Sequence, residues 1–214
     1  MKMLIKKSGI TNKRGNSYVF ESNNGHSCIV VPIYHPYAVL KEPRHRYLFE
    51  TDIKNAYEKY VLGKTNKGDF VYSTATEIHE VEAIAEKLQH TSETIAIDIE
   101  TTGLNFLTDK VQTIAMAIEG MTYVIPLDHK DSPFKEGEPD RDRVWVLLRA
   151  ILENPKNKKV FHNAKFDLKF LIGHDIDTQN VWDTKIMHHF INETAPKSLM
   201  DLVKLYFSDE LENL

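Results

Sequence analysis

Two carboxylates lie close together in the stretch Thr94–Leu104, which reads Thr-Ile-Ala-Ile-Asp-Ile-Glu-Thr-Thr-Gly-Leu. An Ile-rich run ended by glycine predicts a strand buried in an α/β sheet. Because side chains alternate across a strand, Asp98 and Glu100 project from one face, and Ile97 and Ile99 project from the other. Two acids at the end of a buried strand repel each other and lose hydration, and a divalent cation with oxygen ligands compensates for both effects. The alternative is a solvated strand terminus whose acids face water.

A second acid lies in the stretch 159–171, Lys-Val-Phe-His-Asn-Ala-Lys-Phe-Asp-Leu-Lys-Phe-Leu. Val160 and Phe161 predict the end of a short strand, and a helix is expected to begin close to Asn163. Asn163 and Asp167 are four residues apart and would share one helical face. Asp167 has apolar neighbours, so it is either exposed, with Asn163 a plain helix cap, or committed to a partner. The presence of Asp98 and Glu100 in the first strand favours the second alternative, in which Asp167 has a partner.

The elements that must position these acids are predicted from periodicity and turn signals. Residues 70–72 suggest a short strand, and Thr76 is the expected N-cap of a helix running through Leu88. The runs 110–118 and 121–126 surround Glu119-Gly120 and predict a hairpin, hence an antiparallel pairing beside the first strand. A polar loop over 128–140 and a helix over 144–152 follow, and Asn154-Pro155 stops that helix.

Residues 1–62 are predicted to form a unit of their own. Two β-prone runs, 17–20 and 28–33, surround the turn signal Asn23-Asn24-Gly25 and predict a hairpin. Apolar residues recur at helical spacing from Pro43 to about Leu62. A lone hairpin and helix bury little surface and need a neighbour. The polar stretch 63–69, with two glycines and no apolar period, is the expected linker.

The composition limits the class of protein. The 214 residues allow one domain, or one domain and a smaller piece, and 42 % hydrophobic with 27 % charged residues is ordinary for a globular protein. With a formal charge of −4 and no basic tail, any contact with nucleic acid has to be a local groove. The single cysteine, Cys28, fits a reducing compartment and excludes a cysteine-rich zinc site. No signal peptide or membrane-length apolar run is found, so we expect a cytoplasmic protein without a membrane partner.

Residues Asp98–Asn105 and His162–Asp167 resemble the first two motifs of the DEDD superfamily of 3′–5′ exonucleases, specifically the proofreading domain of family A DNA polymerases. The expected hairpin and helix lie between them. Val181–Thr184, followed by an apolar helix, and Ser198–Val203 match weaker downstream landmarks. The likeness covers roughly residues 70–207. It implies a ribonuclease H-like fold: a mixed sheet with the antiparallel hairpin, flanked by helices, over an exonuclease-like domain 70–214.

This resemblance implies hydrolysis of the terminal phosphodiester of a DNA strand by two divalent cations, Mg²⁺ or Mn²⁺, held about 4 Å apart. Asp98 would bridge the two ions, Glu100 would hold the ion that binds the attacking water, and Asp167 would serve the second ion. Hard oxygen ligands favour these metals over zinc. The same resemblance implies that the substrate, a single-stranded DNA 3′ end, is contacted by four further residues: Thr101, Leu104, Asn163 and Phe166. The alternative is a purely structural role for these residues: Leu104 and Phe166 would be core residues, and Thr101 would be a turn residue.

The sequence departs from this family at its fourth acid. The family carries a later helix with the pattern Tyr-x-x-x-Asp, and no such spacing follows Asp167; Tyr206 and Asp209 are three apart. We therefore expect a chain truncated before its last motif, with a separate or fused polymerase domain supplying that motif. Two hypotheses follow: a 3′–5′ exonuclease completed by another polypeptide or weakly active alone, and a catalytically incomplete nucleic-acid-binding or polymerase-scaffolding module. An RNA substrate, as in ribonuclease D, is a third option, since metal ligands do not detect the 2′-hydroxyl.

A second resemblance concerns residues 1–62. The segments Ile10–Gly15 and Val31–Leu40 are similar to the C-terminal part of a uracil-DNA glycosylase-superfamily domain. In that family a His-Pro loop contacts the target nucleotide, and His35 is the matching residue. The water-activating motif of the family is absent here, so this unit is expected to be a vestigial or scaffold segment in which His35 is a loop histidine.

Overall fold

The computed structural model describes residues 9–11, 13–64 and 71–207. It divides the chain into two compact units. The sheet unit comprises Asp69–Met187, and the hairpin unit comprises Met1–Gly68 together with His188–Leu214. The boundary near residue 68 falls in the predicted linker 63–69, most of which lies outside the described residues. Residues from His188 onward group with the N-terminal residues, whereas the sequence interpretation assigned them to the exonuclease-like domain.

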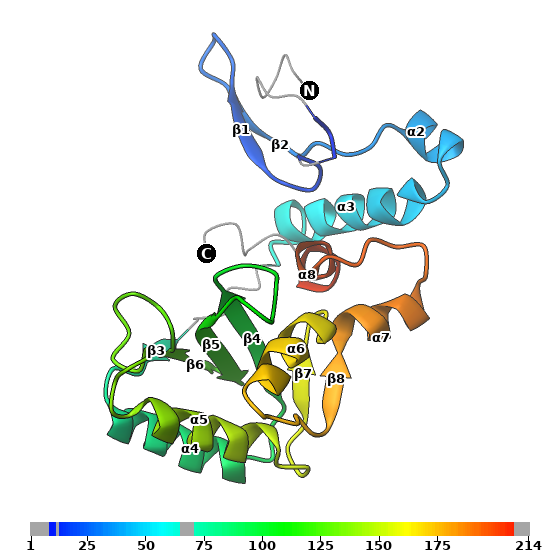
Figure 1. The fold of residues 1–214 in the computed structure, drawn as a ribbon. Helices are drawn as coiled ribbons and strands as arrows, with labels where there is room; N and C mark the ends of the chain where they lie inside the picture. The colour runs from blue at the N-terminus through cyan, green and yellow to red at the C-terminus, as the bar shows by residue number, and fades with distance from the viewer. Residues whose placement is uncertain (1–8, 12, 65–70, 208–214) are drawn as a thin grey trace. The chain divides into compact units, whose positions relative to one another are not determined.

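The sheet unit is built on a mixed sheet of β3 (Tyr72–Thr74), β4 (Ile95–Thr101), β5 (Val111–Ile118), β6 (Met121–Pro126), β7 (Lys159–Phe161) and β8 (Val181–Asp183). The strand order is β3-β6-β5-β4-β7-β8, with β5 antiparallel to both β4 and β6 and the other pairings parallel (Figure 1). The helices are α4 (Ile78–His90), α5 (Arg141–Leu152), α6 (Lys165–Gly173) and α7 (Thr184–Ile191), the last of which crosses the boundary between the units. The predicted α/β class, hairpin and antiparallel pairing are confirmed.

The alternation along β4 is as predicted. Ile95, Ile97 and Ile99 are buried, while Asp98 and Glu100 lie on the open face. An alternating strand with one buried face specifies its register strongly, because a slip by one residue would expose every isoleucine. The two acids are therefore held on the same face by the burial of their neighbours.

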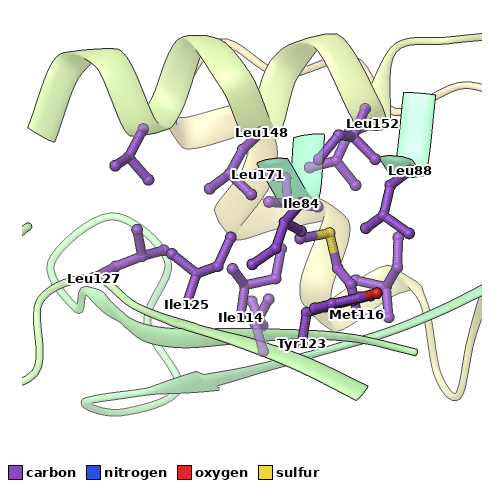
Figure 2. Packing of buried hydrophobic residues seen from close by; sticks show 14 of the residues in the cluster. Ile84, Leu88, Ile114, Met116, Tyr123, Ile125, Leu127, Leu148, Leu152 and Leu171 are labelled. Atoms are coloured by element: carbon purple, nitrogen blue, oxygen red, sulfur yellow. The ribbon is translucent and has the colours of Figure 1, made fainter. Parts of the chain in front are cut away.

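The core of the sheet unit lies under α4 and α5. Figure 2 shows that side chains from these helices and from α6 meet those of the hairpin strands: Ile84, Leu88, Leu148, Leu152 and Leu171 against Ile114, Met116, Tyr123 and Ile125. The apolar stripe predicted over 144–152 is the buried face of α5. This packing holds in place the sheet from which the acids of β4 project.

The N-terminus of α4 differs from the expectation. The N-cap is Glu77 rather than Thr76. The Glu80 carboxylate accepts hydrogen bonds from the backbone N–H groups of Thr76 (2.7 Å) and Glu77 (3.0 Å), and the Glu77 side chain completes a capping box. Because the reciprocal bonds join Glu77 and Glu80, the helix begins one residue later than a threonine cap at residue 76 would place it.

We expect Glu80→Ala to lower the free energy of unfolding of the sheet unit, because two backbone donors at the start of α4 lose their acceptor. Equilibrium denaturation in urea, followed by circular dichroism, measures this change. Glu86→Ala, at an exposed position of the same helix, is the control and should change the free energy of unfolding by no more than about 0.5 kcal/mol. An equal loss in both variants would contradict the capping role.

The hairpin unit contains β1 (Tyr18–Glu21), β2 (Ser27–Val30), α2 (Pro36–Lys41), α3 (His45–Tyr60) and α8 (Leu199–Phe207). The β1–β2 pairing is antiparallel, and Gly25 has φ +79° in the predicted turn. The predicted hairpin and helix are confirmed. A buried ion pair lies in this unit: Arg14 Nε and Nη2 donate to the Asp52 carboxylate at 2.9 and 2.8 Å.

Helix α8 is joined to the N-terminal residues of the hairpin unit by side-chain contacts. Lys204 Nζ donates to Asn16 Oδ1 (2.6 Å), the Asn55 amide donates to the Lys204 carbonyl, and Arg14 Nη1 lies 3.8 Å from Asp201. These contacts give the predicted hairpin-and-helix piece the neighbour that it needs. Among the residues described here, no helix has the length and apolar character required to cross a membrane.

Candidate active site

The end of β4 carries the first two acids next to an irregularity of the sheet. The β4–β5 register shifts between Glu100 and Thr101, so that Thr101 pairs with Val111 rather than with Gln112. A β-bulge of this kind bends the strand and redirects side chains, and bulges are frequent beside active sites. The Thr101 hydroxyl donates to the Gly103 carbonyl (2.7 Å) and closes the turn that follows.

Asp167 reaches β4 from α6. It is the third residue of that helix and only 4 % exposed, and its Oδ1 accepts a hydrogen bond from the Ile99 backbone N–H at 3.3 Å. The parallel strand β7 pairs with β4 only at Ile95 and Ala96. Beyond that pairing, the Asp167 carboxylate satisfies a strand donor that β7 does not reach. Asp167 is therefore committed to a partner, as the first strand's acids suggested, and is not exposed.

The pKa values of Asp167 and Asp98 show that each carboxyl group is influenced by a neighbouring acid. The pKa of Asp167 is raised to about 6, chiefly because burial disfavours its ionised form. The negative charge of Asp98 acts in the same direction, and the backbone N–H groups near Asp167 oppose it. The pKa of Asp98, whose side chain is exposed on the open face of β4, is also raised, by desolvation and then by the charge of Glu100. Asp98 thus lies within electrostatic reach of both other acids.

The junction between β7 and α6 differs from the sequence interpretation. Asn163 is neither a plain helix cap nor on a helical face with Asp167, because it precedes α6 and has φ +70°, in the left-handed region. Asparagine tolerates this conformation better than most residues. Its Oδ1 accepts a hydrogen bond from Lys185 Nζ (3.1 Å). The N-cap of α6 is Ala164, whose side chain has no acceptor.

A residue from another strand caps α6 instead. The Asp183 carboxylate, at the end of β8, accepts hydrogen bonds from the backbone N–H groups of Asn163 (3.1 Å) and Ala164 (2.9 Å). It also accepts from Lys185 (2.9 Å) and Ile186 (3.4 Å) at the start of α7. Sequence reasoning noted Asp183 only as part of a landmark. An aspartate between a short strand and an apolar helix is an N-cap signal for α7, but nothing local indicates the bonds to α6.

The four predicted substrate-contacting residues lie around this edge of the sheet. Thr101 is half-buried and bonded within its turn, and Leu104 is 85 % exposed. Asn163 is exposed at the start of the β7–α6 turn. Phe166 is half-buried against the core, with its ring centroid 5.2 Å from that of Phe170. The structure therefore leaves Leu104 and Asn163 accessible, whereas Phe166 packs mainly against the core.

His35 belongs to the hairpin unit. It is exposed, and its Nδ1 accepts a hydrogen bond from the Tyr37 backbone N–H (3.1 Å), which caps α2. This contact gives the histidine a local structural role.

The donors at the candidate site suit a hard divalent cation. Asp98, Glu100 and Asp167 offer only carboxylate oxygens, the ligand type preferred by Mg²⁺ and Mn²⁺. A cation would favour the ionised forms that burial and mutual repulsion disfavour at Asp98 and Asp167. Over the described ranges, no group of three or more His, Cys, Asp or Glu side chains is arranged to hold a metal ion. The donor types fit, and the assignment of these acids as metal ligands stays a prediction.

Comparison with known proteins identifies the family. Residues 72–213 match the family model described as 3′–5′ exonuclease. The chain belongs to this 3′–5′ exonuclease family. The match covers the whole site described above, and it confirms the exonuclease part of the sequence resemblance. The glycosylase resemblance of residues 1–62 stays a prediction.

Among the relatives of this chain, a DNA polymerase of Bacillus phage SP01 is 26 % identical over 88 % of this chain and 22 % of that protein. DNA polymerase I of Pseudomonas aeruginosa is 32 % identical over 59 % of this chain and 14 % of that protein. The chain thus spans about a fifth and a seventh of these relatives' lengths.

Solved structures agree with the fold. The catalytic core of RRP6 from Trypanosoma brucei superposes with a TM-score of 0.53 over 94 % of this chain and 51 % of that chain, at 16 % identity. Escherichia coli RNase D, an exoribonuclease involved in structured RNA processing, gives a TM-score of 0.52 over 66 % and 34 %, at 19 % identity. These neighbours have ribonuclease H-like exonuclease folds, which confirms the predicted fold class.

Proposed function

We propose that this chain is a divalent-metal-dependent 3′–5′ exonuclease that removes nucleotides from the 3′ end of DNA in association with a DNA polymerase. The observation that carries the proposal is the placement of Asp167: its carboxylate is bonded to the backbone of β4 and lies within electrostatic reach of Asp98. This arrangement occurs inside the segment that matches the exonuclease family.

Asp98, Glu100 and Asp167 would hold the divalent ions. When bound, such ions activate water as a nucleophile and stabilise the negative charge that develops on a phosphodiester during hydrolysis. The protein fold itself orients these carboxylates. The burial of Ile97 and Ile99 fixes the side of β4 from which its two acids project, and the Ile99 N–H orients Asp167. The exposed Leu104 would contact the terminal nucleotide, with Thr101 holding the turn that presents it.

DNA is the favoured substrate because both relatives described above are DNA polymerases. The neighbours named for RNA processing share the fold at low identity, and they carry no argument about substrate. The phage polymerase also supports an association with a polymerase: a match over 88 % of 214 residues leaves at most about 26 residues unmatched, so it extends into the hairpin unit. We propose that this unit is a glycosylase-like scaffold in which His35 caps α2.

A second candidate function is a catalytically incomplete nucleic-acid-binding or polymerase-scaffolding module. It is favoured by one observation, the lack of a three-ligand metal group among the residues described. The fourth acid of the family is not assigned in the described part of the chain, and Asp209, the residue considered for it, lies outside that part. The two candidates differ in whether the chain hydrolyses DNA from its 3′ end in a reaction that requires Asp98 and a divalent cation.

The test combines a nuclease assay with thermal unfolding, using the full chain and its Asp98→Ala variant. We expect Mn²⁺ to raise the Tm of the wild type but not of the variant, since a cation that binds only the folded state stabilises it. We also expect Mn²⁺-dependent shortening of 5′-labelled single-stranded DNA that the substitution abolishes. Shortening that survives Asp98→Ala would overturn the proposal. Binding of Mn²⁺ and DNA without shortening would favour the second candidate.

A further inference from the structure

Asp183 joins the two helices that leave the site edge of the sheet. Phe161 of β7 pairs with Asp183 of β8, so the ends of these parallel strands lie side by side. Oδ2 of Asp183 accepts from Ala164 N–H, and Oδ1 accepts from Asn163, Lys185 and Ile186 N–H. One carboxylate therefore serves the N-termini of both α6 and α7.

This carboxylate is already compensated without a cation. A carboxylate has about four lone-pair sites, and four backbone N–H groups point at Asp183. Negative charge at helix N-termini is also favoured by the helix dipole. Asp183 is thus placed to organise the turn rather than to act as a further metal ligand.

The bonds to Asn163 and Ala164 decide where α6 begins. Ala164 has no side-chain acceptor, so α6 lacks a cap of its own, and Asn163 is held at φ +70°. Asp167 follows three residues after Ala164. Its contact with Ile99 N–H therefore depends on the position of the first turn of α6.

A second contact joins the same two junctions. His162 Nδ1 lies 2.9 Å from Thr184 Oγ1, and this hydroxyl donates to the Phe161 carbonyl at 3.2 Å. Because the hydroxyl hydrogen is used by Phe161, the histidine ring nitrogen is the donor to Thr184. The start of α7 is therefore also fixed to the end of β7 through Thr184, the residue that follows Asp183.

We propose that Asp183 is a positioning residue of the nuclease: its carboxylate sets the first turn of α6 and so holds Asp167 against β4 beside Asp98. This inference rests on the proposed function for its consequence in catalysis, but the positioning itself needs no metal. Asp183 acts through Asp167 and does not contact substrate.

The experiment compares the wild type with Asp183→Ala, Asp183→Asn, Asp98→Ala and Glu80→Ala. Glu80→Ala is the matched control, because it also removes a carboxylate that accepts two backbone N–H groups at a helix start, but on α4. Two quantities are measured on the full chain. The first is the hydrogen-exchange protection of the Ile99 amide relative to Ile97, without divalent ions. The second is the Mn²⁺ concentration that produces half of the increase in Tm.

We expect Asp183→Ala to lower the relative protection of Ile99 about tenfold and to raise the Mn²⁺ midpoint about 10- to 100-fold, the usual effect of losing a partner that orients a metal ligand. Asp183→Asn keeps one acceptor oxygen and should lie between Asp183→Ala and the wild type. Glu80→Ala should leave both quantities unchanged, even if it lowers the overall Tm.

The outcomes separate this inference from the proposed function. If Mn²⁺ does not stabilise the wild type more than Asp98→Ala, the proposed metal site is wrong, while the Ile99 measurement still decides the positioning role. If Asp183→Ala retains wild-type protection of Ile99 and a wild-type Mn²⁺ midpoint, the positioning role is wrong. Should Asp183→Ala not fold, Asp183→Asn is judged by the same two measurements: wild-type values would overturn the inference, and lowered protection would support it.

Discussion

Asp167→Asn is expected to stabilise the metal-free protein by about 1–3 kcal/mol at pH 7.5, although it removes a residue of the candidate active site. The wild-type pKa near 6, against an ordinary value of 3.8, means that folding disfavours the ionised carboxylate. The residue is only 4 % exposed, so solvent screening is weak. Asparagine has nearly the same shape, and its amide oxygen can still accept the Ile99 N–H. It avoids the cost of burying a charge.

The pH dependence has a definite sign. Because the folded-state pKa of Asp167 is raised, the native state binds more protons than the unfolded state between about pH 4 and 6. The unfolding free energy of the wild type should therefore fall relative to that of Asp167→Asn as the pH rises through this window. The difference in unfolding free energy that is due to ionisation of Asp167 should be near zero below pH 4 and should reach its full value at pH 7. Urea denaturation of both proteins in EDTA, from pH 4 to 7.5, measures it.

Adding Mn²⁺ should reverse this order. The wild type gains stability from a bound cation, whereas Asp167→Asn loses one carboxylate ligand and gains less. Any Mn²⁺-dependent shortening of DNA should fall by at least about 100-fold, since even residues that only orient a ligand cost up to that factor. If Asp167→Asn is less stable than the wild type in EDTA at pH 7.5, the charge of Asp167 does not destabilise the folded state.

Asp52→Ala should destabilise the hairpin unit by about 3 kcal/mol. Arg14 is 6 % exposed and Asp52 is 3 % exposed, and removing one partner of a buried pair leaves an uncompensated buried charge, which costs roughly 3–5 kcal/mol. We expect the lower end of that range because Asp201 lies 3.8 Å from Arg14 and provides part of the compensation.

Hydrogen exchange of α3 amides measures this loss, with β5 amides of the sheet unit followed for comparison. Glu50→Ala is the control in the same helix. It removes an exposed ion pair with Arg46, and solvent-exposed ion pairs contribute little to stability. Arg14→Leu combined with Asp52→Leu should recover much of the stability, because no buried charge remains. An Asp52→Ala variant as stable as Glu50→Ala would show that the pair contributes nothing.

The local features of this fold were predictable because they depend on neighbours in the sequence. The β4 alternation and the β5–β6 hairpin follow from side-chain period and turn residues, and the structure confirms both. The stop of α5 before Asn154-Pro155 is similarly local. The Thr76 cap was wrong by one residue, since two adjacent residues compete as caps and the reciprocal bonds of Glu77 and Glu80 decide between them.

By itself, the sequence determined which acids share a face of β4, and its two motifs indicated the exonuclease family that the comparison established. Only the tertiary structure decided which partner the third acid, Asp167, contacts. Asp167 meets Ile99, 68 residues earlier, and Asp183 caps a helix that begins 18 residues before it. Such contacts join separate strands and helices, so they depend on how the sheet brings those ends together and have no periodic signature in the chain.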